Sequence, residues 1–532
     1  MTLSMATAPM PAKRITFKKS PNGTIYVYYT TKAYRNSKGK PTSDEVLIGK
    51  KDLESGMLIP NKKYLELFPE IVPLTQKITS VHKITDYGNT YVLTKIAEET
   101  GLPQILEKCF PSKWANILAA AFYMICEGNV MMYLEDWFEV TEVPFFGTMS
   151  DRRCGEMFAS ITYEERMTFF EEWIKIRQEQ EYIAYDVTSI STYSSGIDIA
   201  EWGYNRDDER LPQVNLGMYF GTTSQLPVYY TIYSGSITDK SYLIFMLENT
   251  GRLGINKACF VMDRGFVKEE NIAYMAEKGY PFIVPFPMDR VEAAAMLDKY
   301  GASIRKAANR INDADLYGTG FDYELYRIPM KAHIFFDPEK QNLDEKELYA
   351  RIARLSGELK KMSGAKRVTR RYTDFFAVEE EKSGISFEMD CDKVDERLKK
   401  AGFCIFLTTD MSCSSENLMR IYRGRDVIEK NFCQLKNGLD FRRLRTHINE
   451  TTEGKVFVGF LALILRTCLL GKVKAQTDTR RLTLDKVLLE LKKIKTVIMS
   501  DRHRMVTPLT KTQKTILAAL GISHENLLNS IA

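Results

Sequence analysis

The hydrophobic positions of the first 180 residues change from a strand-like to a helical pattern. Residues 15–17, 25–29 and 46–48 alternate as strands do and are separated by turn residues. From residue 92 to about residue 178 the apolar positions recur with a helical period, and Thr162 and Glu165 have the spacing of a capping box. The pattern predicts a β-rich N-terminal region, residues 1–75, and an α-helical domain, residues 76–180.

At residue 182 the pattern returns to strands. Residues 182–192, 214–220 and 226–233 form three apolar strands with short connections, so they are expected to be antiparallel neighbours. A helix at 240–249, a strand at 258–263, a helix at 268–278 and a strand at 281–285 follow. The order β-β-β-α-β-α-β predicts an α/β domain, residues 181–292, with a mixed sheet flanked by helices.

The remaining chain is divided by its polarity. Residues 293–415 are more polar and are interpreted as an insertion, after which residues 416–436 predict a long amphipathic helix. The apolar run at 456–465 is ten residues long, about half of what a membrane-crossing helix needs, and predicts a buried helix. We expect residues 416–470 to complete the α/β core and residues 471–532 to form a basic helical tail.

Composition and charge narrow the class of protein. Hydrophobic residues make up 44% and charged residues 27% of the 532 positions, which is typical of a soluble globular protein. Residues 471–532 hold twelve Lys and Arg against five Asp and Glu, although the whole chain carries only +5. A cluster of basic residues like this one is suited to binding the phosphate backbone of a nucleic acid. The alternative interpretation is a set of helix faces that are exposed to solvent.

Several common kinds of site are absent from the sequence. The nine cysteines form no Cys-x-x-Cys pair, and the five histidines show no His-x-x-x-His spacing, so zinc and dithiol sites are not expected. There is no Gly-x-Ser-x-Gly elbow and no nucleotide phosphate loop. The cysteine usage and the lack of a secretory signal predict a cytoplasmic protein with no membrane partner.

Two acidic residues occur in predicted apolar strands. Asp186 lies within 182–192 and Asp263 ends 258–263. A carboxylate in an apolar strand is costly unless it is paired or bound to a cation. The strand order predicts that these two strands are neighbours, which would bring both carboxylates together. A backbone hydrogen bond for Asp186 and a strand-end cap for Asp263 are the alternative interpretations.

A third group of polar residues lies on the predicted helix at 416–436. With about 100° per residue, Tyr422, Arg425, Glu429 and Lys436 fall within an arc of roughly 60°. An apolar face adjoins this stripe and consists of Ile421, Ile428, Phe432 and Leu435. The helix is therefore expected to dock with its polar stripe at the edge of the sheet, and an ordinary amphipathic helix with ion pairs is the alternative.

The spacing Tyr-x2-Arg-x3-Glu-x6-Lys resembles the signature of DDE transposases of bacterial insertion sequences, in the insertion-sequence-4 group. The order of Asp186, Asp263 and Glu429, with an insertion between the second and third acid, is also similar to this group. The resemblance covers about residues 182–470 and implies a ribonuclease H-like fold. It further implies a DNA transposase that cleaves the ends of an insertion sequence and joins their 3′-hydroxyl groups to target DNA.

The resemblance also assigns roles to the predicted site residues. Asp186, Asp263 and Glu429 would be the catalytic residues and the ligands of two Mg²⁺ ions, for which Mn²⁺ would substitute, with Asp186 shared by both ions. Tyr422, Arg425 and Lys436 would bind phosphates of the DNA. The expected partners are double-stranded DNA, as terminal inverted repeats and target, and a second copy of the chain. The helical domain at 76–180 is expected to contact DNA.

Two alternatives remain open from the sequence. One is a ribonuclease H-like nuclease that cuts DNA without joining it, and the other is a DNA-binding relative of transposases that has no catalytic activity. A glycosidase built from Asp186 and Glu429 would leave the basic clusters unexplained. Asp239 is interpreted as a helix cap, and the hydroxyls of Thr188 and Ser189 as ordinary strand hydroxyls rather than phosphate contacts.

Overall fold

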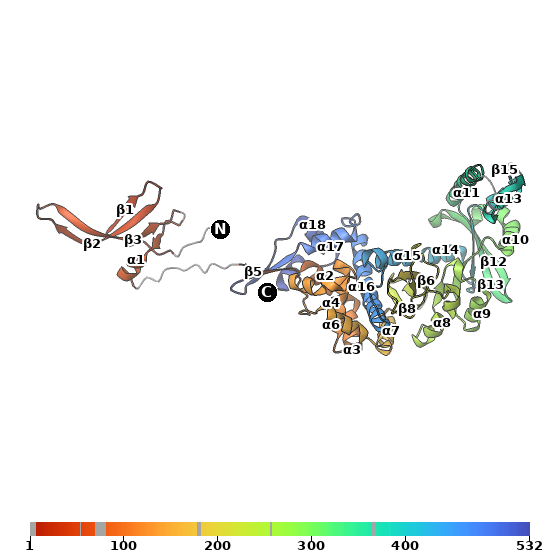
Figure 1. Cartoon of the computed structure of the whole chain (residues 1–532), viewed down its shortest axis with the longest axis horizontal. Helices are drawn as coiled ribbons and strands as arrows, with labels where there is room; N and C mark the ends of the chain where they lie inside the picture. Colours follow the sequence, from red (N-terminus) through yellow and green to blue (C-terminus); the bar gives the residue numbers. More distant parts are fainter. Residues whose placement is uncertain are drawn as a thin grey trace. The chain divides into compact units, whose positions relative to one another are not determined.

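Figure 1 shows the computed structural model of the protein, which describes residues 7–53, 55–69, 81–177, 182–255, 258–362, 368–381 and 384–531. The chain forms two compact units. One consists of Met1–Ile84 with Val497–Met505, and the other of Thr85–Thr496 with Val506–Ala532. The predicted boundaries at 75/76 and 180/181 lie outside the described residues.

The first unit contains a four-stranded antiparallel sheet with the order β1-β2-β3-β4. Its elements are β1 (Ile15–Lys19), β2 (Ile25–Arg35), β3 (Pro41–Lys51), β4 (Leu58–Pro60) and helix α1 (Lys62–Leu67). Val27, Ile48, Leu58 and Tyr64 form its small core. The three strands predicted within residues 15–50 are therefore confirmed, and a fourth strand completes the sheet.

The second unit begins with a group of helices. They are α2 (Gly88–Thr100), α3 (Leu102–Cys109), α4 (Trp114–Glu127), α5 (Leu134–Val140), α6 (Asp151–Ala159) and α7 (Tyr163–Arg177). The capping box predicted at the start of α7 is present, because Thr162 N donates to Glu165 Oε2 over 2.8 Å and Glu165 N donates to Thr162 Oγ1 over 3.2 Å. The helical period of this segment is confirmed.

A nine-stranded mixed sheet follows these helices, with the order β11-β12-β13-β16-β10-β9-β6-β7-β8. The elements predicted for residues 182–285 are all present: β6 (Tyr182–Ser191), β7 (Gln213–Gly221), β8 (Pro227–Ser234), α8 (Asp239–Arg252), β9 (Cys259–Val261), α9 (Glu269–Glu277) and β10 (Phe282–Phe286). The pairs β6–β7 and β7–β8 are antiparallel, whereas β9 is parallel to both β6 and β10. The mixed sheet and the strand neighbours predicted from the sequence are confirmed.

Alternate strand residues pack on opposite faces of this sheet. Val261, Ile283 and Phe406 belong to one apolar cluster, whereas their neighbours Phe260 and Phe282 belong to the main core. The first cluster is covered by α14 (Ser415–Arg423), which contributes its buried apolar residues to it. Because successive side chains of a strand point to opposite faces, apolar residues lie on both faces of the sheet, and helices cover both faces.

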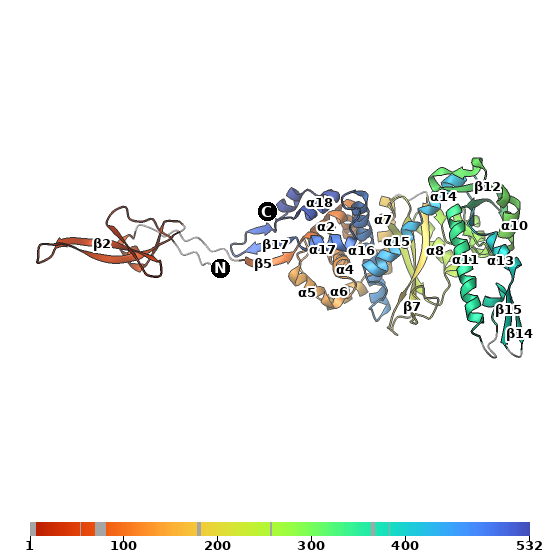
Figure 2. The same cartoon turned by 90° about the horizontal axis from the view of Figure 1, so that it is seen from above.

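The segment predicted as an insertion extends the sheet and also forms a separate lobe. Its strands β11 (Arg310–Ile311), β12 (Leu316–Leu325), β13 (Ile328–Phe336) and β16 (Phe403–Thr408) join the edge next to β10. Its other elements are α10 (Val291–Tyr300), α11 (Pro338–Leu359), α12 (Arg370–Thr373), β14 (Phe376–Glu381), β15 (Gly384–Met389) and α13 (Cys391–Leu398). α11 and the β14–β15 hairpin lie side by side around their own apolar cluster (Figure 2).

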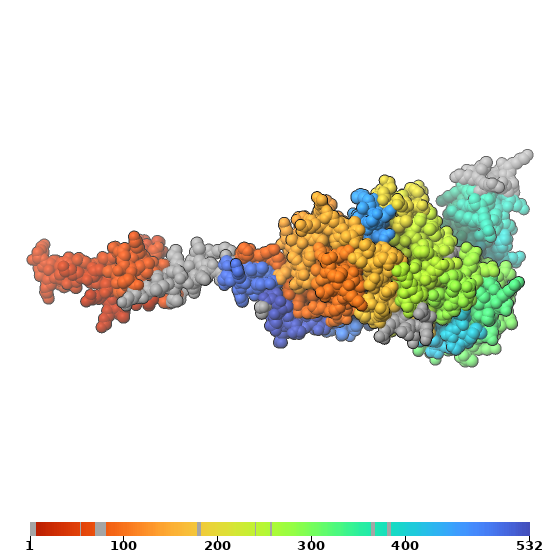
Figure 3. Space-filling model, turned by 90° about the horizontal axis from the view of Figure 1, so that it is seen from below, coloured from red at the N-terminus to blue at the C-terminus, as the bar shows by residue number. Residues whose placement is uncertain are grey.

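The longest buried helix is α16 (Asn449–Ala475), which contacts α2, α4 and α6 as well as the sheet strand β8. By length and composition it could cross a membrane, but 72% of its most apolar window is buried within the protein. Figure 3 shows the helical segment (orange) and the sheet region (yellow to green) meeting along a continuous surface. The helical segment and the sheet therefore share one hydrophobic core.

Lys455 is a charged residue of α16 that is only 2% exposed. Its Nζ donates hydrogen bonds to the backbone oxygens of Asn129, over 2.8 Å, and Arg445, over 3.5 Å. Burial lowers the pKa of Lys455 to about 7 from its ordinary 10.5. Between these two pH values the unfolded chain binds more protons at this position than the folded chain does.

The free energy of unfolding is therefore expected to rise with pH from about 7 to 10.5 through Lys455, by up to about 1.4 kcal/mol per pH unit. Lys455→Met should remove this part of the slope in urea denaturation measured across that range. Lys474→Met, at an exposed position of the same helix, is the matched control and should keep the slope. An unchanged slope in Lys455→Met would contradict the buried-lysine explanation.

The C-terminal segment contains both helices and strands. It consists of α17 (Leu484–Lys492), β17 (Lys495–Met499), β18 (Arg504–Val506), α18 (Lys511–Ala519) and α19 (His524–Asn529). β17 lies between β18 and β5 (Val81–Asp86) in a three-stranded sheet. The helices expected in this segment are present, and its two strands were not predicted.

Candidate active site

The two predicted carboxylates lie near the end of one pair of neighbouring strands. β6 and β9 pair in parallel as far as Ala184 with Val261, Asp186 lies two residues further along β6, and Asp263 lies two residues beyond the end of β9, close enough to act on Asp186 through its charge. Each carboxylate accepts one local backbone hydrogen bond of 2.8 Å, Asp186 from Val187 N and Asp263 from Arg264 N. These two bonds are the backbone hydrogen bond and the strand-end cap that the alternative interpretations expected. Each of them uses only one oxygen of its carboxylate. The second oxygen of each acid is left for another partner.

The third acid comes from a helical segment that differs from the predicted one. In place of one helix over 416–436, α14 is followed by a tight turn at Gly424 and Arg425, by α15 (Asp426–Cys433) and by a π-helical turn, Gln434–Gly438. At the turn the hydrogen bonds run from residue i to i−3, as in Arg425 N to Tyr422 O at 2.9 Å. The prediction of a continuous α-helix was wrong, because both the tight turn and the π turn change the helical period.

The apolar face of this segment docks as predicted. Ile421, Ile428 and Leu435 are at most 5% exposed, and the half-buried Phe432 packs edge-on against Phe220 of β7. Figure 2 shows α14 and α15 following one another along the sheet. The docking of this face brings the polar residues between Tyr422 and Lys436 to the sheet.

Arg425 is the residue that connects the three acids electrostatically. Its Nη2 donates to Asp186 Oδ2 over 2.9 Å, and its side chain is 10% exposed. Burial disfavours the charged guanidinium, but Asp186, Asp263 and Glu429, together with Tyr422, raise the pKa of Arg425 above its ordinary value. The guanidinium is therefore the internal counter-ion of this acidic cluster.

Asp186 shows the cost of placing a carboxylate in a sheet. Burial raises its pKa, Arg425 and the Val187 N–H oppose that rise, and the nearby Asp263 adds to it. The side chain is 21% exposed, so the carboxylate retains contact with solvent. Because the charge of Arg425 offsets this cost only in part, the site favours additional positive charge.

The donor chemistry of the three acids fits a hard divalent cation. Carboxylate oxygens are the ligands that Mg²⁺ and Mn²⁺ prefer, and nitrogen or sulfur ligands are not part of this cluster. Within the ranges that the structure describes, no three side chains of His, Cys, Asp or Glu lie close enough together to hold a metal ion. Arg425 contacts Asp186, and the charges of Asp263 and Glu429 also act on its guanidinium.

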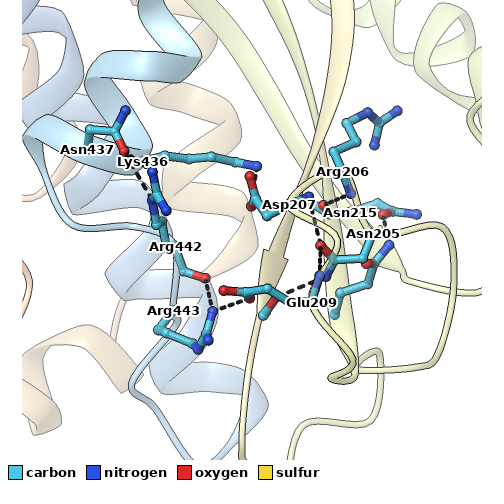
Figure 4. A network of polar contacts seen from close by, with 12 residues as sticks. Asn205, Arg206, Asp207, Glu209, Asn215, Lys436, Asn437, Arg442 and Arg443 are labelled. Carbon is cyan, nitrogen blue, oxygen red and sulfur yellow. Dashed lines mark hydrogen bonds and ion pairs between the residues drawn. The ribbon is translucent and has the colours of Figure 1, made fainter. Parts of the chain in front are cut away.

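Lys436 has a partner that the sequence pattern did not indicate. It is 9% exposed, and its Nζ donates to Asp207 Oδ2 over 2.6 Å (Figure 4). Asp207 belongs to the loop between β6 and β7, and in the same loop Glu209 pairs with Arg443. Sequence reasoning missed Asp207 and Glu209 because loop acids have no periodic pattern, although the Asp-Asp-Glu run at 207–209 is a cluster of charge.

Tyr422 lies between an apolar cluster and the acidic site. Its ring packs edge-on against Phe406 of β16 with centroids 4.4 Å apart, and burial raises the pKa of its hydroxyl. Arg425 is close enough to lower that pKa in part, so the phenol lies at the border between the apolar cluster and the acidic site. Of the predicted site residues, Asp186 and Arg425 are in direct contact, whereas Asp263, Glu429 and Tyr422 are near enough to Arg425 to act on its pKa.

Three further polar residues near the first acid have structural roles. The interpretation of Asp239 as a helix cap was wrong, since its carboxylate accepts a hydrogen bond from Tyr233 Oη over 2.9 Å and pairs with Arg206. Thr188 and Ser189 are at most 3% exposed, and Ser189 Oγ accepts from Arg206 N over 3.1 Å. Both hydroxyls are buried strand residues, as the sequence predicted.

Many basic residues of the C-terminal segment are engaged within the protein. Lys492 pairs with Glu127, Lys493 with Glu490 and Lys495 with Asp86. Because these ion pairs already neutralise the lysines, each would have to exchange a carboxylate for a phosphate in order to contact DNA. The net positive charge of the segment alone therefore does not identify a DNA-binding surface.

Comparisons with known proteins complete the description of the site. The family model described as "Transposase DDE domain" matches residues 177–465, which is more than half of the chain and includes all six predicted site residues. A search of the curated proteins found no match. Among solved structures, a piggyBac transposase synaptic complex with hairpin DNA matches with 8% identity and a TM-score of 0.32, over 70% of this chain and 78% of that one.

Proposed function

The chain belongs to the family of transposases with a DDE domain, and we propose that it binds the ends of an insertion sequence, cleaves them and joins their 3′-hydroxyl ends to target DNA. Within the family we assign it to the insertion-sequence-4 group, on the basis of Tyr422, Arg425, Glu429 and Lys436 at the signature spacing. The expected partners are double-stranded DNA and a second copy of the chain, and the expected location is the bacterial cytoplasm.

The fold proposed for the catalytic domain is ribonuclease H-like. The strand order β8-β7-β6-β9-β10, with three antiparallel strands followed by two parallel ones, supports this assignment. In it Asp186 lies on the first strand, Asp263 follows the fourth strand, and Glu429 lies on a helix that packs against the first strand. The nine-stranded sheet exceeds this core by the four strands of the segment at 293–415.

The roles of the chain's own residues follow from the site. Asp186, Asp263 and Glu429 would hold two Mg²⁺ ions, which supply an activated oxygen nucleophile and stabilise the leaving oxygen. Arg425, freed from Asp186, would donate hydrogen bonds to a phosphate at the bond being cleaved. Lys436 would exchange Asp207 for a neighbouring phosphate, and the Tyr422 hydroxyl would position a phosphate oxygen by a hydrogen bond.

One observation carries the proposal more than any other. Asp186 lies on β6, Asp263 follows the neighbouring parallel strand β9, and Arg425 from the segment of Glu429 is buried against Asp186. Three acids distant in sequence thereby act on the charge of one buried cation, and Asp186 contacts it directly. Such a concentration of negative charge is costly for folding alone, so a role in binding cations and phosphates accounts for it better than a structural one.

Strand transfer is the reaction that tests this proposal. Purified protein, Mg²⁺, a duplex carrying the inverted repeat that flanks the reading frame, and a supercoiled plasmid should yield plasmid covalently joined to the duplex. The reacting assembly should contain at least two protein chains, because two ends must be held together. Gel electrophoresis with labelled duplex measures joining, and light scattering of the assembly measures its mass.

The same assay separates the transposase from a nuclease. Both enzymes would cut the duplex, but only a transposase keeps the freed 3′-hydroxyl end bound and uses it as the next nucleophile. Nicked or linear DNA without joined product, across a set of end sequences taken from both flanks, would favour the nuclease. Binding without any Mg²⁺-dependent or Mn²⁺-dependent cleavage would instead favour a non-catalytic relative.

A further inference from the structure

Two basic side chains beside the proposed active site are held by acids of one loop. Lys436 Nζ donates to Asp207 Oδ2 over 2.6 Å, and Arg443 Nη1 donates to Glu209 Oε2. Figure 4 shows both cations pointing from the segment after α15 toward the loop between β6 and β7, residues 192–212. Lys436 belongs to the predicted set of phosphate-binding residues, whereas Arg443 and the two acids do not.

The loop is fixed in the conformation that presents these acids. Asn205 is buried and donates from Nδ2 to Ser191 Oγ over 3.0 Å at the end of β6. Its Oδ1 accepts hydrogen bonds from Asp207 N over 2.9 Å and from Glu209 N over 3.3 Å. Asparagine side chains commonly stabilise a turn in this way. The two carboxylates are therefore carried on a backbone that is anchored to the sheet.

The segment that carries Arg443 is attached to the same strand end. Ser191 N donates to Arg442 O over 3.2 Å, and Leu444 N donates to Ser191 O over 3.1 Å. The backbone around Arg443 thereby pairs with the end of β6 as a parallel bridge. Asn129 of the helical segment also donates from Nδ2 to Arg443 O over 3.0 Å. Backbone contacts thus hold both the acid and the cation, so the fold itself determines their pairing.

Both ion pairs are largely shielded from solvent. The side chains of Lys436 and Asp207 are 10% and 21% exposed, and those of Arg443 and Glu209 are 22% and 24% exposed. Burial disfavours the charge of Glu209, but hydrogen bonds from Ser191 and Arg443 lower its pKa below the ordinary value, so this carboxylate is ionised at neutral pH. A partly buried cation needs an anion, and in the absence of DNA the two acids supply it.

We propose that Arg443 is a further phosphate-binding residue beside the active site, and that the two loop acids hold Arg443 and Lys436 until DNA displaces them. The proposal rests on the proposed function and adds to it one phosphate contact and two competing acids. Carboxylate and phosphate oxygens accept the same charge-assisted hydrogen bonds from lysine and arginine. DNA and the loop would therefore compete for the same two cations.

The competition gives the acids an effect on DNA binding whose sign is diagnostic. If Asp207 and Glu209 only stabilised the fold, removing their charge would loosen the two cations and leave DNA binding weaker or unchanged. If they occupy the positions of phosphates, removing their charge spares the DNA the work of breaking an ion pair for each contact. Binding would then become stronger.

Amide substitutions at the two acids provide the test. Asp207→Asn and Glu209→Gln keep the shape of each side chain and an oxygen that accepts a hydrogen bond, but they remove the charge that competes with phosphate. In EDTA, which prevents metal-dependent cleavage, each full-length variant should bind an end-sequence duplex about threefold to tenfold more tightly than the wild type. Fluorescence anisotropy of labelled duplex measures the affinity, and circular dichroism and thermal denaturation check the fold.

Asp208 is the matched control within the same loop. It is exposed, and within the part of the chain that the structure describes its side chain forms no ion pair. Its φ of 55° lies in the left-handed region, which asparagine also adopts. Asp208→Asn removes one charge without freeing a cation, so at about 0.15 M salt, where distant charges are screened, it should change the affinity less than about twofold.

The cations themselves supply a second measurement. Lys436→Gln and Arg443→Gln should each weaken duplex binding and reduce the slope of log affinity against log salt concentration by about 0.9, the value for one phosphate contact. In the Lys436→Gln background, Asp207→Asn should leave the affinity unchanged, because the acid then has no cation to withhold from DNA. Glu209→Gln should likewise have no effect in the Arg443→Gln background.

Three results would overturn the proposal. Equal or weaker duplex binding by both folded acid variants would leave the acids a structural role only. An equally large gain in Asp208→Asn would assign the effect to net charge. An unchanged salt slope in Arg443→Gln would remove Arg443 from the DNA contacts. Failure of the wild type to bind any duplex would reject the proposed function itself, whereas normal wild-type binding together with any of the three results would reject this proposal alone.

Discussion

Alanine at Asp186 is expected to abolish DNA cleavage, lowering its rate on the order of 10³-fold or more. The expectation follows from its position, because Asp186 is the acid that contacts Arg425 and lies near enough to Asp263 for that charge to raise its pKa. Asp263→Ala and Glu429→Ala should have effects of the same order, since each removes one of the three proposed metal-binding carboxylates, whose charges act on the same arginine. The measurement is single-turnover cleavage of an end-sequence duplex in Mg²⁺ and in Mn²⁺.

Binding of DNA should survive these substitutions. Removing a carboxylate reduces the repulsion of phosphates, so affinity for the duplex should be equal or higher. Asp426→Asn is the matched control, because Asp426 is exposed, lies three residues before Glu429 and pairs only with Lys430 on the helix surface. The control should cleave normally. Near-normal cleavage by any one of the three alanine variants would remove that residue from the catalytic set.

The strands around the catalytic acids could be predicted from the sequence because their signal is local. Alternating apolar residues identify β6, β7 and β8, and short connections determine that these three strands are antiparallel neighbours. The right-handed crossover through α8 then places β9 beside β6. Asp186 and Asp263 come near each other as a consequence of these rules for strand pairing, which do not depend on the acids themselves.

The helix of Glu429 shows where such reasoning fails. A uniform period of 3.6 residues placed Tyr422, Arg425, Glu429 and Lys436 on one stripe, but the tight turn at Gly424 and the π turn at Gln434–Gly438 shift the residues beyond them. Lys436 consequently contacts the loop between β6 and β7. A helical turn that is one residue tighter or wider than an α-helical turn depends on tertiary packing. Such a turn leaves no periodic signal in the sequence.

Ion pairs were the least predictable part of the site. Lys436 with Asp207 and Arg425 with Asp186 join residues more than 200 positions apart in sequence. Their partners are fixed only when the sheet, the loop and the helix are all in place. The four strands that extend the sheet were also missed, because residues 293–415 were interpreted by their overall polarity, whereas β16 within them is an apolar strand inside the sheet.

Arg425→Met is expected to destabilise the metal-free protein by about 3 kcal/mol, near the low end for breaking a buried ion pair because Asp186 is 21% exposed. Methionine retains most of the apolar stem, so the loss reports mainly the charge. Urea denaturation in EDTA measures it, and Lys430→Met is the matched control. Lys430 forms a surface pair with Asp426, and its loss should change the free energy of unfolding by less than about 0.5 kcal/mol.

The cause of this destabilisation can be separated from a loss of packing by a second substitution. Asp186→Asn in the Arg425→Met background removes the uncompensated charge while keeping the shape of the side chain, so it should restore most of the lost stability. Mg²⁺ should stabilise Arg425→Met more than the wild type, since the cation would replace a guanidinium that is no longer present. If the double variant is as unstable as Arg425→Met and Mg²⁺ has equal effects on both proteins, Arg425 acts through packing and is not the counter-ion of the three acids.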